Sequence, residues 1–180
     1  GCYNGGICLF DGNEFTSFTK KDGLPSNKVR KLYYKDSLLF IATDSKLCIY
    51  DGNKFYYKSN MMQVMSVKEV NHSIYALSRA MGVFKVDYES NDLANFTLDS
   101  CFWTGTLFGG NTLKNGLLLF KYEDLNFFEN QDLKNCNSFS ENFVTNSITW
   151  DACMTNDGSI YLAQWGIDSD NGGFFKLNNN

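Results

Sequence analysis

The sequence repeats one of its own segments: ICLFDGNEF at 7–15 returns as LCIYDGNKF at 47–55. A repeat period of about 20–50 residues is typical of folds in which each unit buries its apolar face against a copy of itself. Both copies place Asp-Gly-Asn between two short apolar or aromatic runs, which indicates two strands joined by a tight turn. The chain is therefore expected to be a row of repeated β units.

A second recurring feature is a short apolar strand that follows a polar turn. Its copies align on Phe40, Tyr75, Leu119 and Tyr161, at intervals of about 40 residues. Each is followed by a second aromatic strand and usually by a third that ends in Phe-Thr or Phe-Ser. Four short strands per unit, joined by turns, indicate the blade of a β-propeller.

The pattern thus predicts an all-β protein, a β-propeller with four-stranded antiparallel blades. We expect one domain over 1–180 that contains about four blades and an N-terminal partial blade. The units are predicted at 1–19 (partial), 28–57, 65–97, 106–139 and 148–177. The last unit lacks its outermost strand. Either the N-terminal strands close a small ring against it, or the segment belongs to a larger propeller, which is the interpretation we favour.

Two further features bear on this organisation. The chain begins with Gly1 rather than methionine, so we expect it to be a piece of a longer protein. The segment 54–70 contains Met61, Met62 and Val64 at a spacing that also permits a helix. Because Tyr56 and Tyr57 precede them and the blade pattern requires strand there, strand is the expected structure.

Charge and hydropathy exclude some classes of function. The formal charge is −4 with a pI near 4.9, and no dense run of Lys or Arg occurs. A surface that follows a nucleic-acid backbone is therefore not expected. The basic residues around 20–31 are expected to form a solvated surface. No apolar run reaches the roughly 18 residues of a membrane-spanning helix, so we expect no membrane insertion of this segment.

The cysteines and the single histidine do not indicate a metal site. Cys8 and Cys48 occupy the same position in two repeats and are expected to be small buried residues, and pairing among the six cysteines stays open. Cys-x-x-Cys is absent, which argues against zinc. The loop 168–173 fails the EF-hand pattern, because Gly172 stands at its fifth position and no glutamate closes it. We expect neither a metal nor a cofactor.

The run DGLPSNKVRKLYYKDSLLFIATDSKLCIYDGNKFYYK at 22–58 resembles the repeat of the two-component regulator propellers. That repeat reads Gly-Leu-Pro-Ser-Asn, an apolar pair three residues apart, a Trp-x-Gly-Thr strand, Gly-Leu and Tyr-Asp-Gly. The matching residues here are 23–27, Val29 with Leu32, 40–43, Leu47 and 50–52. The family tryptophan is replaced by Phe40, Tyr75, Leu119 and Tyr161, and the resemblance fades after the first unit.

This resemblance implies a propeller in the extracytoplasmic sensor region of hybrid histidine kinases and related regulators, many of which recognise oligosaccharides. It implies a periplasmic or extracellular location and an oligosaccharide or protein ligand. The leading hypothesis is a non-enzymatic recognition propeller. A propeller-type glycosidase or polysaccharide lyase is one alternative, and a structural protein-interaction module is another. Unclosed sheet edges also predict self-association into a homo-oligomer.

The tryptophans provide the candidate site, because propellers place ligands over the central channel. Trp103 is predicted in the connector 97–105, Trp150 in or just after the connector 140–149, and Trp165 in a loop of the last unit, all on one face. An indole offers a flat apolar surface and one donor, which suits stacking on a sugar ring. The candidate ligand-binding residues are Trp103, Trp150, Trp165, Arg79, Gln164, Asp168 and Asp170, with Asp99, Glu123, Asp124 and Asp151 as nearby acids. The alternative is that each tryptophan wedges between adjacent blades.

Catalysis is not expected. A glycosidase needs paired carboxylates on strands that face the channel, where Glu69 is the clearest acid and Asp151 is a second candidate. His72 lies in a predicted turn on the opposite face from the tryptophans, so it is interpreted as a turn residue rather than as part of a catalytic triad.

Overall fold

The structure is a computed structural model that describes residues 1, 4–59, 61, 63–102, 105–121, 124–130, 132–135, 147–166 and 172–177. These residues form short antiparallel strands and two single-turn 3₁₀ helices, η1 (Lys20–Asp22) and η2 (Leu93–Asn95). The predicted all-β class is confirmed. The helical alternative for 54–70 is wrong, since the described residues there include strands on both sides of a short connection.

Four sheets follow one another along the chain, each ordered from an inner strand outward. The first contains β3 (Val29–Lys35), β4 (Leu38–Thr43), β5 (Leu47–Tyr50) and β6 (Phe55–Tyr57). The second contains β7 (Val64–Val70), β8 (Ser73–Ser78), β9 (Gly82–Asp87) and β10 (Thr97–Phe102). The third contains β11 (Leu107–Leu113), β12 (Gly116–Lys121), β13 (Asp124–Glu129) and β14 (Asp132–Asn135). The fourth contains β15 (Ser147–Met154), β16 (Ile160–Gly166) and β17 (Gly173–Leu177).

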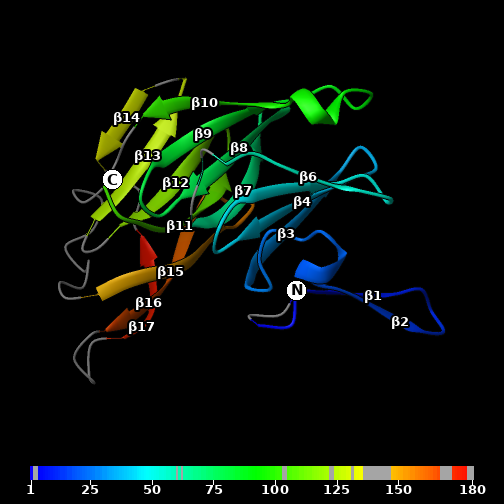
Figure 1. Ribbon diagram of the computed structural model, residues 1–180. Coiled ribbons are helices and arrows are strands. Elements are labelled where there is room, and N and C mark those ends of the chain that lie inside the picture. Colours follow the sequence, from blue (N-terminus) through cyan, green and yellow to red (C-terminus); the bar gives the residue numbers. More distant parts are fainter. Residues whose placement is uncertain are drawn as a thin grey trace.

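The sheets fan out around their inner strands (Figure 1). β3 contacts β7, β7 contacts β11, and β11 contacts β15, whereas the outer strands diverge. This is the arrangement of propeller blades, and the ring of sheets is open. The predicted partial propeller of four-stranded blades is therefore confirmed.

The N-terminal hairpin, β1 (Ile7–Phe10) and β2 (Phe15–Phe18), forms a separate two-stranded sheet. It packs on the first sheet through Ile7, which joins a core cluster with Val29 and Ile41. In the described part of the chain, no hydrogen-bonded pairing connects this hairpin to the fourth sheet. The alternative in which the N-terminal strands close the ring is therefore wrong for this structure.

The two copies of the repeated segment adopt the same turn. Asp11 Oδ1 accepts hydrogen bonds from the backbone N–H groups of Asn13 and Glu14 at 2.8 and 2.9 Å. Asp51 Oδ1 accepts the equivalent pair at 2.8 Å each, and these bonds lower the pKa of both carboxyl groups. Gly12 and Gly52 follow with φ of 107° and 98°, a region that only glycine adopts readily.

Hydrophobic clusters between neighbouring sheets hold the fan together. Successive side chains of a strand point to opposite faces of its sheet. Where a sheet is covered by a neighbour on each face, its strands are therefore apolar on both faces. On β4, Phe40 and Ala42 pack against the second sheet, whereas Ile41 belongs to the cluster shared with the N-terminal hairpin. This two-sided burial explains the continuous apolar runs at 38–42 and 117–120.

The structure corrects the alignment of the repeats by one residue in the third unit. Phe40 is the third residue of β4 and pairs with Tyr33, and Tyr75 is the third residue of β8 and pairs with Lys68. The third residue of β12 is Leu118, so Leu118 rather than Leu119 is the equivalent position. Leu118 packs toward the fourth sheet and Leu119 toward the second. A shift of one residue moves a side chain to the other face of a strand.

Two further predictions are wrong. Residues 97–102, predicted as part of a connector, form the outermost strand β10, because Leu93 and Phe96 are buried and fix the chain just before it. Cys8 is exposed, since its side chain lies on the face of the N-terminal hairpin opposite Ile7, while Cys48 is buried as predicted. Cys8, Cys48, Cys101 and Cys153 are free thiols.

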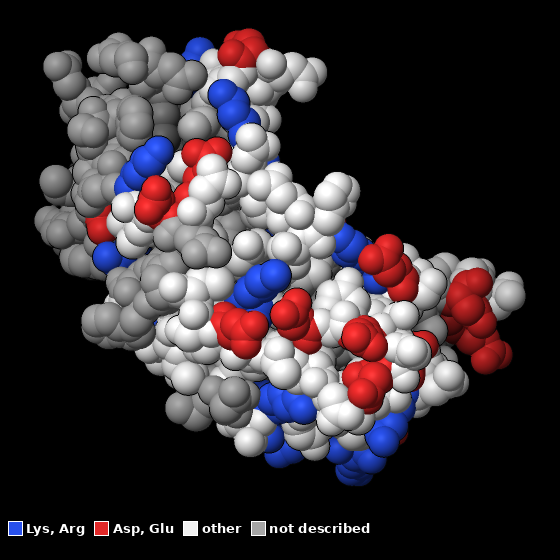
Figure 2. Space-filling view, turned by 90° about the horizontal axis from the view of Figure 1, so that it is seen from above, with Lys and Arg blue, Asp and Glu red and all other residues white. Residues whose placement is uncertain are grey.

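One face of the fourth sheet carries exposed aromatic side chains. Leu162 points to the third sheet, whereas Trp165 and Phe174 are 66% and 70% exposed on the other face. Phe174 stacks on Tyr161 with ring centroids 5.3 Å apart. Exposed apolar surface of this kind favours association. Elsewhere, acidic and basic side chains lie interspersed over the face shown in Figure 2.

We expect the chain to self-associate through this aromatic face. Sedimentation equilibrium or light scattering should show a concentration-dependent dimer, and the double variant Trp165→Ser, Phe174→Ser should shift the equilibrium toward the monomer. Leu133→Ser, which removes a 42% exposed apolar side chain on β14, is the matched control and should leave the equilibrium unchanged. A wild-type chain that stays monomeric at high concentration would contradict this expectation.

Candidate functional site

A cavity of about 540 Å³ lies where the inner strands of the four sheets meet. It is lined by residues of β3, β7, β11 and β15, so every sheet contributes one wall. Its volume falls in the range of about 300–1,000 Å³ that is typical of small-molecule sites. Because Phe108 and Trp150 lie beside charged groups in its lining, the cavity offers both apolar surface and polar contacts.

Each inner strand has a β-bulge at the same place. The register shifts between Val29 and Lys31, Val64 and Ser66, Leu107 and Gly109, and Thr149 and Asp151. The extra residues at the four bulges are Arg30, Met65, Phe108 and Trp150, and all of them line the cavity. A bulge redirects a side chain that a regular strand would send elsewhere. We call these residues the bulge ring.

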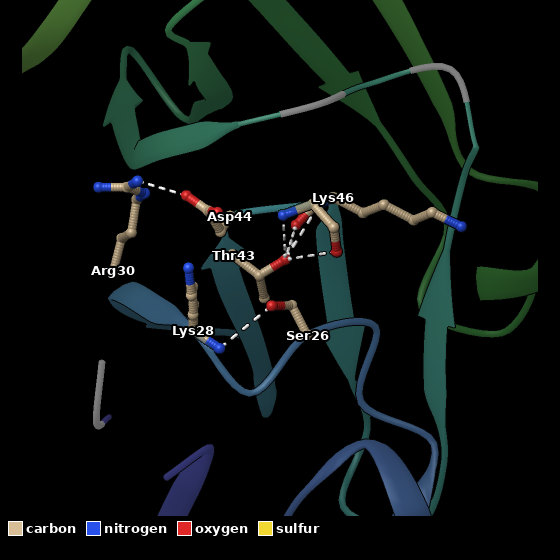
Figure 3. A network of polar contacts seen from close by, with 7 residues as sticks. Ser26, Lys28, Arg30, Thr43, Asp44 and Lys46 are labelled. Atoms are coloured by element: carbon tan, nitrogen blue, oxygen red, sulfur yellow. Dashed lines mark hydrogen bonds and ion pairs between the residues drawn. The ribbon is translucent and has the colours of Figure 1, made fainter. Parts of the chain in front are cut away.

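Arg30 is held by the loop between β4 and β5 (Figure 3). Its guanidinium group forms an ion pair with Asp44. Asp44 is fixed in turn by the backbone hydrogen bond from its N–H to Lys28 O at 3.0 Å. Thr43 Oγ1 donates to Lys46 O at 2.7 Å and accepts from Lys46 N–H at 2.9 Å, which closes the loop. The first member of the bulge ring is therefore set in place by its own sheet.

Arg79 and Phe108 connect the second and third sheets beside the cavity. The guanidinium carbon of Arg79 lies 5.0 Å from the centre of the Phe108 ring, within the range of a cation–π contact. The Arg79 carbonyl accepts a hydrogen bond from Leu107 N–H at 3.0 Å. The predicted site residue Arg79 thus contacts the bulge ring rather than lining the cavity itself.

The structure brings together two of the three predicted tryptophans. Trp150 and Trp165 pack edge to face with centroids 6.2 Å apart, and both indoles are mostly exposed. Trp150 lies on β15, just after the predicted connector, whereas Trp165 lies on β16 rather than in the predicted loop, because the β15–β16 pairing extends from Ser147 to Gly166. Trp150 lines the cavity, whereas Trp165 lies on the exposed aromatic face of the fourth sheet.

Gln164 is placed differently from the prediction. Its side chain is buried, and its Nε2 donates to Thr149 Oγ1 across the β15–β16 pair at 3.1 Å. Like Leu162, two residues earlier, it lies on the face of β16 that points toward the third sheet, away from the neighbouring Trp165. Gln164 is therefore not part of the cavity lining.

The remaining predicted residues divide into three groups. Asp151 lines the cavity. Asp99 lies on the outermost strand β10, far from the inner strands, and Asp124 forms an ion pair with Lys121 at 3.1 Å. The residues outside the described part of the chain are Trp103, Glu123, Asp168 and Asp170.

A chain of polar contacts crosses the centre of the fan. Lys68 Nζ donates to Asn111 Oδ1 at 2.7 Å, and Asn111 Nδ2 donates to Asp151 Oδ1 at 3.3 Å. Burial lowers the pKa of Lys68, and the nearby positive charge of Lys31 lowers it further, while Asp151 acts in the opposite direction. β7, β11 and β15 are thereby coupled beside the cavity, which Lys68 and Asp151 line.

A second cavity of about 550 Å³ lies at the opposite end of the inner strands, around Glu69. Glu69 accepts hydrogen bonds from Lys35 and Tyr33, and these two bonds lower the pKa of its carboxyl group. Burial and the bond to Glu69 raise the pKa of Tyr33 to about 12. A general acid of a glycosidase needs a carboxyl group with a raised pKa, and Glu69 has the opposite property.

His72 lies in the two-residue turn between β7 and β8, as predicted. Asn71 and His72 both have positive φ, at 48° and 63°, which is the geometry of a type I′ hairpin turn. The imidazole is 98% exposed, and its Nδ1 lies 3.7 Å from Glu69 Oε1. In the described part of the chain, no cluster of three or more His, Cys, Asp or Glu is arranged to hold a metal ion.

None of the described helices is long and apolar enough to cross a membrane.

The fold and the cavity together define this chain as part of a β-propeller, and solved structures agree. It superposes on the extracellular domain of the putative hybrid two component system BT4673 from B. thetaiotaomicron, with a TM-score of 0.57, 14% identity and coverage of 98% of this chain and 30% of that one. PorZ, a surface component of the type-IX secretion system of Porphyromonas gingivalis, gives a TM-score of 0.55 at 13% identity, with coverage of 98% and 24%. At this identity the likeness concerns the fold.

The chain therefore spans about a third or less of the length of these structures. No family profile matches the sequence. No curated protein is significantly similar to it.

Proposed function

We propose that this chain is part of a non-enzymatic recognition propeller that binds its ligand at the bulge ring. The observation that carries the proposal is the repetition of one β-bulge in all four inner strands, which directs Arg30, Met65, Phe108 and Trp150 into one cavity. Packing alone does not require four bulges in register, and bulges are common next to binding sites.

The chemistry of the ring suits a sugar ligand. Phe108 and Trp150 provide flat apolar surfaces for the faces of a sugar ring, and the exposed indole keeps its N–H as a donor. Asp151 provides carboxylate oxygens in the lining, and the amide of Asn111 links this carboxylate to Lys68. An oligosaccharide ligand and a location outside the cytoplasm also agree with the resemblance of 22–58 to sensor propellers. The structural likeness to an extracellular domain supports the same location.

Hydrolysis of the ligand is not part of the proposal. The acid best placed on an inner strand, Glu69, lies at the opposite end of the strands, and its lowered pKa keeps it ionised. The bound ligand would instead alter contacts between sheets, since the bulge ring joins all four.

Glycan-array screening followed by calorimetry tests this function. For an oligosaccharide that binds the wild type, Trp150→Ala should weaken the affinity by about tenfold or more, because an aromatic side chain that the bound ligand covers often contributes over 2 kcal/mol. Tyr57→Ala is the matched control: this tyrosine is 44% exposed on the outermost strand β6 and should be dispensable for binding. Equal affinity of Trp150→Ala and wild type would remove the bulge ring as the binding site.

A further inference from the structure

The lining of the central cavity carries more positive than negative charge. Arg30, Lys31 and Lys68 line it together with a single acid, Asp151. Arg30 is paired with Asp44, and the side chain of Lys31 forms no hydrogen bond or ion pair with any described residue. Lys31 and Lys68 therefore face one carboxylate, and the cavity has a net positive potential that a ligand anion can neutralise.

Lys68 is held in a position from which it can bind a ligand. Its stem is half-buried in β7, and its ammonium group reaches Asp151 only through the amide of Asn111. An ammonium group has three donors, and the bond to Asn111 uses one of them. Burial lowers the pKa of Lys68, and the positive charge of Lys31 nearby lowers it further.

The wall also contains an unsatisfied hydroxyl. Ser66, the residue after the bulge of β7, is 3% exposed, and its Oγ forms no hydrogen bond with any described residue. A buried polar atom without a partner costs about 1–3 kcal/mol. An acceptor atom that enters the cavity and reaches Ser66 would remove this cost.

We propose that the cavity binds an oxyanion, a carboxylate or sulfate group carried by the ligand, between Lys31 on β3 and Lys68 on β7. This inference rests on the proposed recognition role of the same cavity and adds the charge class of the ligand. The oxyanion accepts charge-assisted hydrogen bonds from both ammonium groups, while Phe108 and Trp150 cover the apolar part of the ligand.

Calorimetric titration of the full chain at constant ionic strength tests the proposal, with glucuronate, glucose, succinate and inorganic sulfate as probes. Glucuronate and sulfate should bind, and glucose should bind at least tenfold more weakly than glucuronate. Lys31→Gln and Lys68→Gln should each weaken glucuronate binding by about tenfold, the typical effect of losing one charge-assisted hydrogen bond. Lys54→Gln, in the exposed turn between β5 and β6, is the control and should retain wild-type affinity.

The outcomes separate this inference from the function on which it rests. Glucuronate binding that both lysine variants retain would overturn the oxyanion site, even if Trp150→Ala still abolished binding of a neutral glycan. Lysine-dependent binding of glucuronate but not succinate supports an acidic sugar, and lysine-dependent binding of both supports a general carboxylate site. Lys31 is exposed, so Lys31→Gln tests the proposal even if Lys68→Gln does not fold.

Discussion

Replacing Phe40 with alanine should lower the free energy of unfolding by about 3–5 kcal/mol. Phe40 is fully buried at the centre of the cluster that joins the first and second sheets. Its ring packs edge to face against Tyr88, with centroids 5.2 Å apart. The truncation therefore leaves a cavity in the hydrophobic interface between the first and second sheets. Urea denaturation followed by tryptophan fluorescence measures the change.

Phe15→Ala is the matched control for this prediction. The side chain is 73% exposed on the N-terminal hairpin, so its removal should change the free energy of unfolding by no more than about 0.5 kcal/mol. If Phe40→Ala were as well tolerated as Phe15→Ala, the two sheets would not be packed face to face through Phe40.

Adding a single methyl group at Gly110 should destabilise the protein by about 1–3 kcal/mol. A Cβ atom there would lie 2.6 Å from Leu77 Cδ2 and 2.8 Å from the Leu118 carbonyl oxygen. Leu77 belongs to the second sheet, which would have to move away from β11, whereas Leu118 lies on β12 beside Gly110, so the β11–β12 pairing would also be strained. Because Gly110 lines the central cavity, Gly110→Ala should also weaken ligand binding.

Gly109→Ala separates a steric effect from a general effect of losing a glycine. The two residues are neighbours on β11, but a Cβ at Gly109 would meet only the Phe120 ring, at 3.4 Å. This is close to ordinary contact, and the variant should unfold at a higher urea concentration than Gly110→Ala. The reverse order would show that β11 does not lie as close to the second sheet as described.

The sequence predicts the blades well because turns and apolar strands, which are local features of the sequence, define each repeat. The Asp-Gly-Asn turns after Phe10 and Tyr50 fix two hairpins, and both faces of β4 are apolar because it lies between two layers. These signals depend on residues close together in the chain. The register of the third unit is harder to predict, since Leu117, Leu118, Leu119 and Phe120 give no alternation to set it.

The bulge ring could not be predicted from any single unit. Arg30, Met65, Phe108 and Trp150 have no chemistry in common, so a search for one motif misses them. The four units share a signal only when their bulges are aligned. At each bulge a large side chain directly follows the last paired residue, which is Val29, Val64, Leu107 or Thr149. The predicted tryptophan site includes only one member of the bulge ring, Trp150, because that prediction is based on residue type and not on position in the strand.

The outer strand of the second sheet was missed for a different reason. By analogy with the other units, the sequence pattern predicts that a strand ends at Phe96-Thr97. Tertiary packing decides otherwise: η2 lets Leu93 and Phe96 fill the cluster beneath, and the strand begins only at Thr97. As a result, a segment predicted to lie over the channel is on the outside of the blade.

The central claim is that, in the part of the chain that the structure describes, four sheets are arranged radially and each packs against the next one in sequence. Methyl and aromatic NOEs in an isotope-labelled sample test it most directly. The structure predicts NOEs between Phe40 and Ala76, between Leu77 and Leu119, and between Leu118 and Leu162, which join consecutive sheets. NOEs that join the core of the first sheet directly to that of the third, as in a two-layer sandwich, would contradict it.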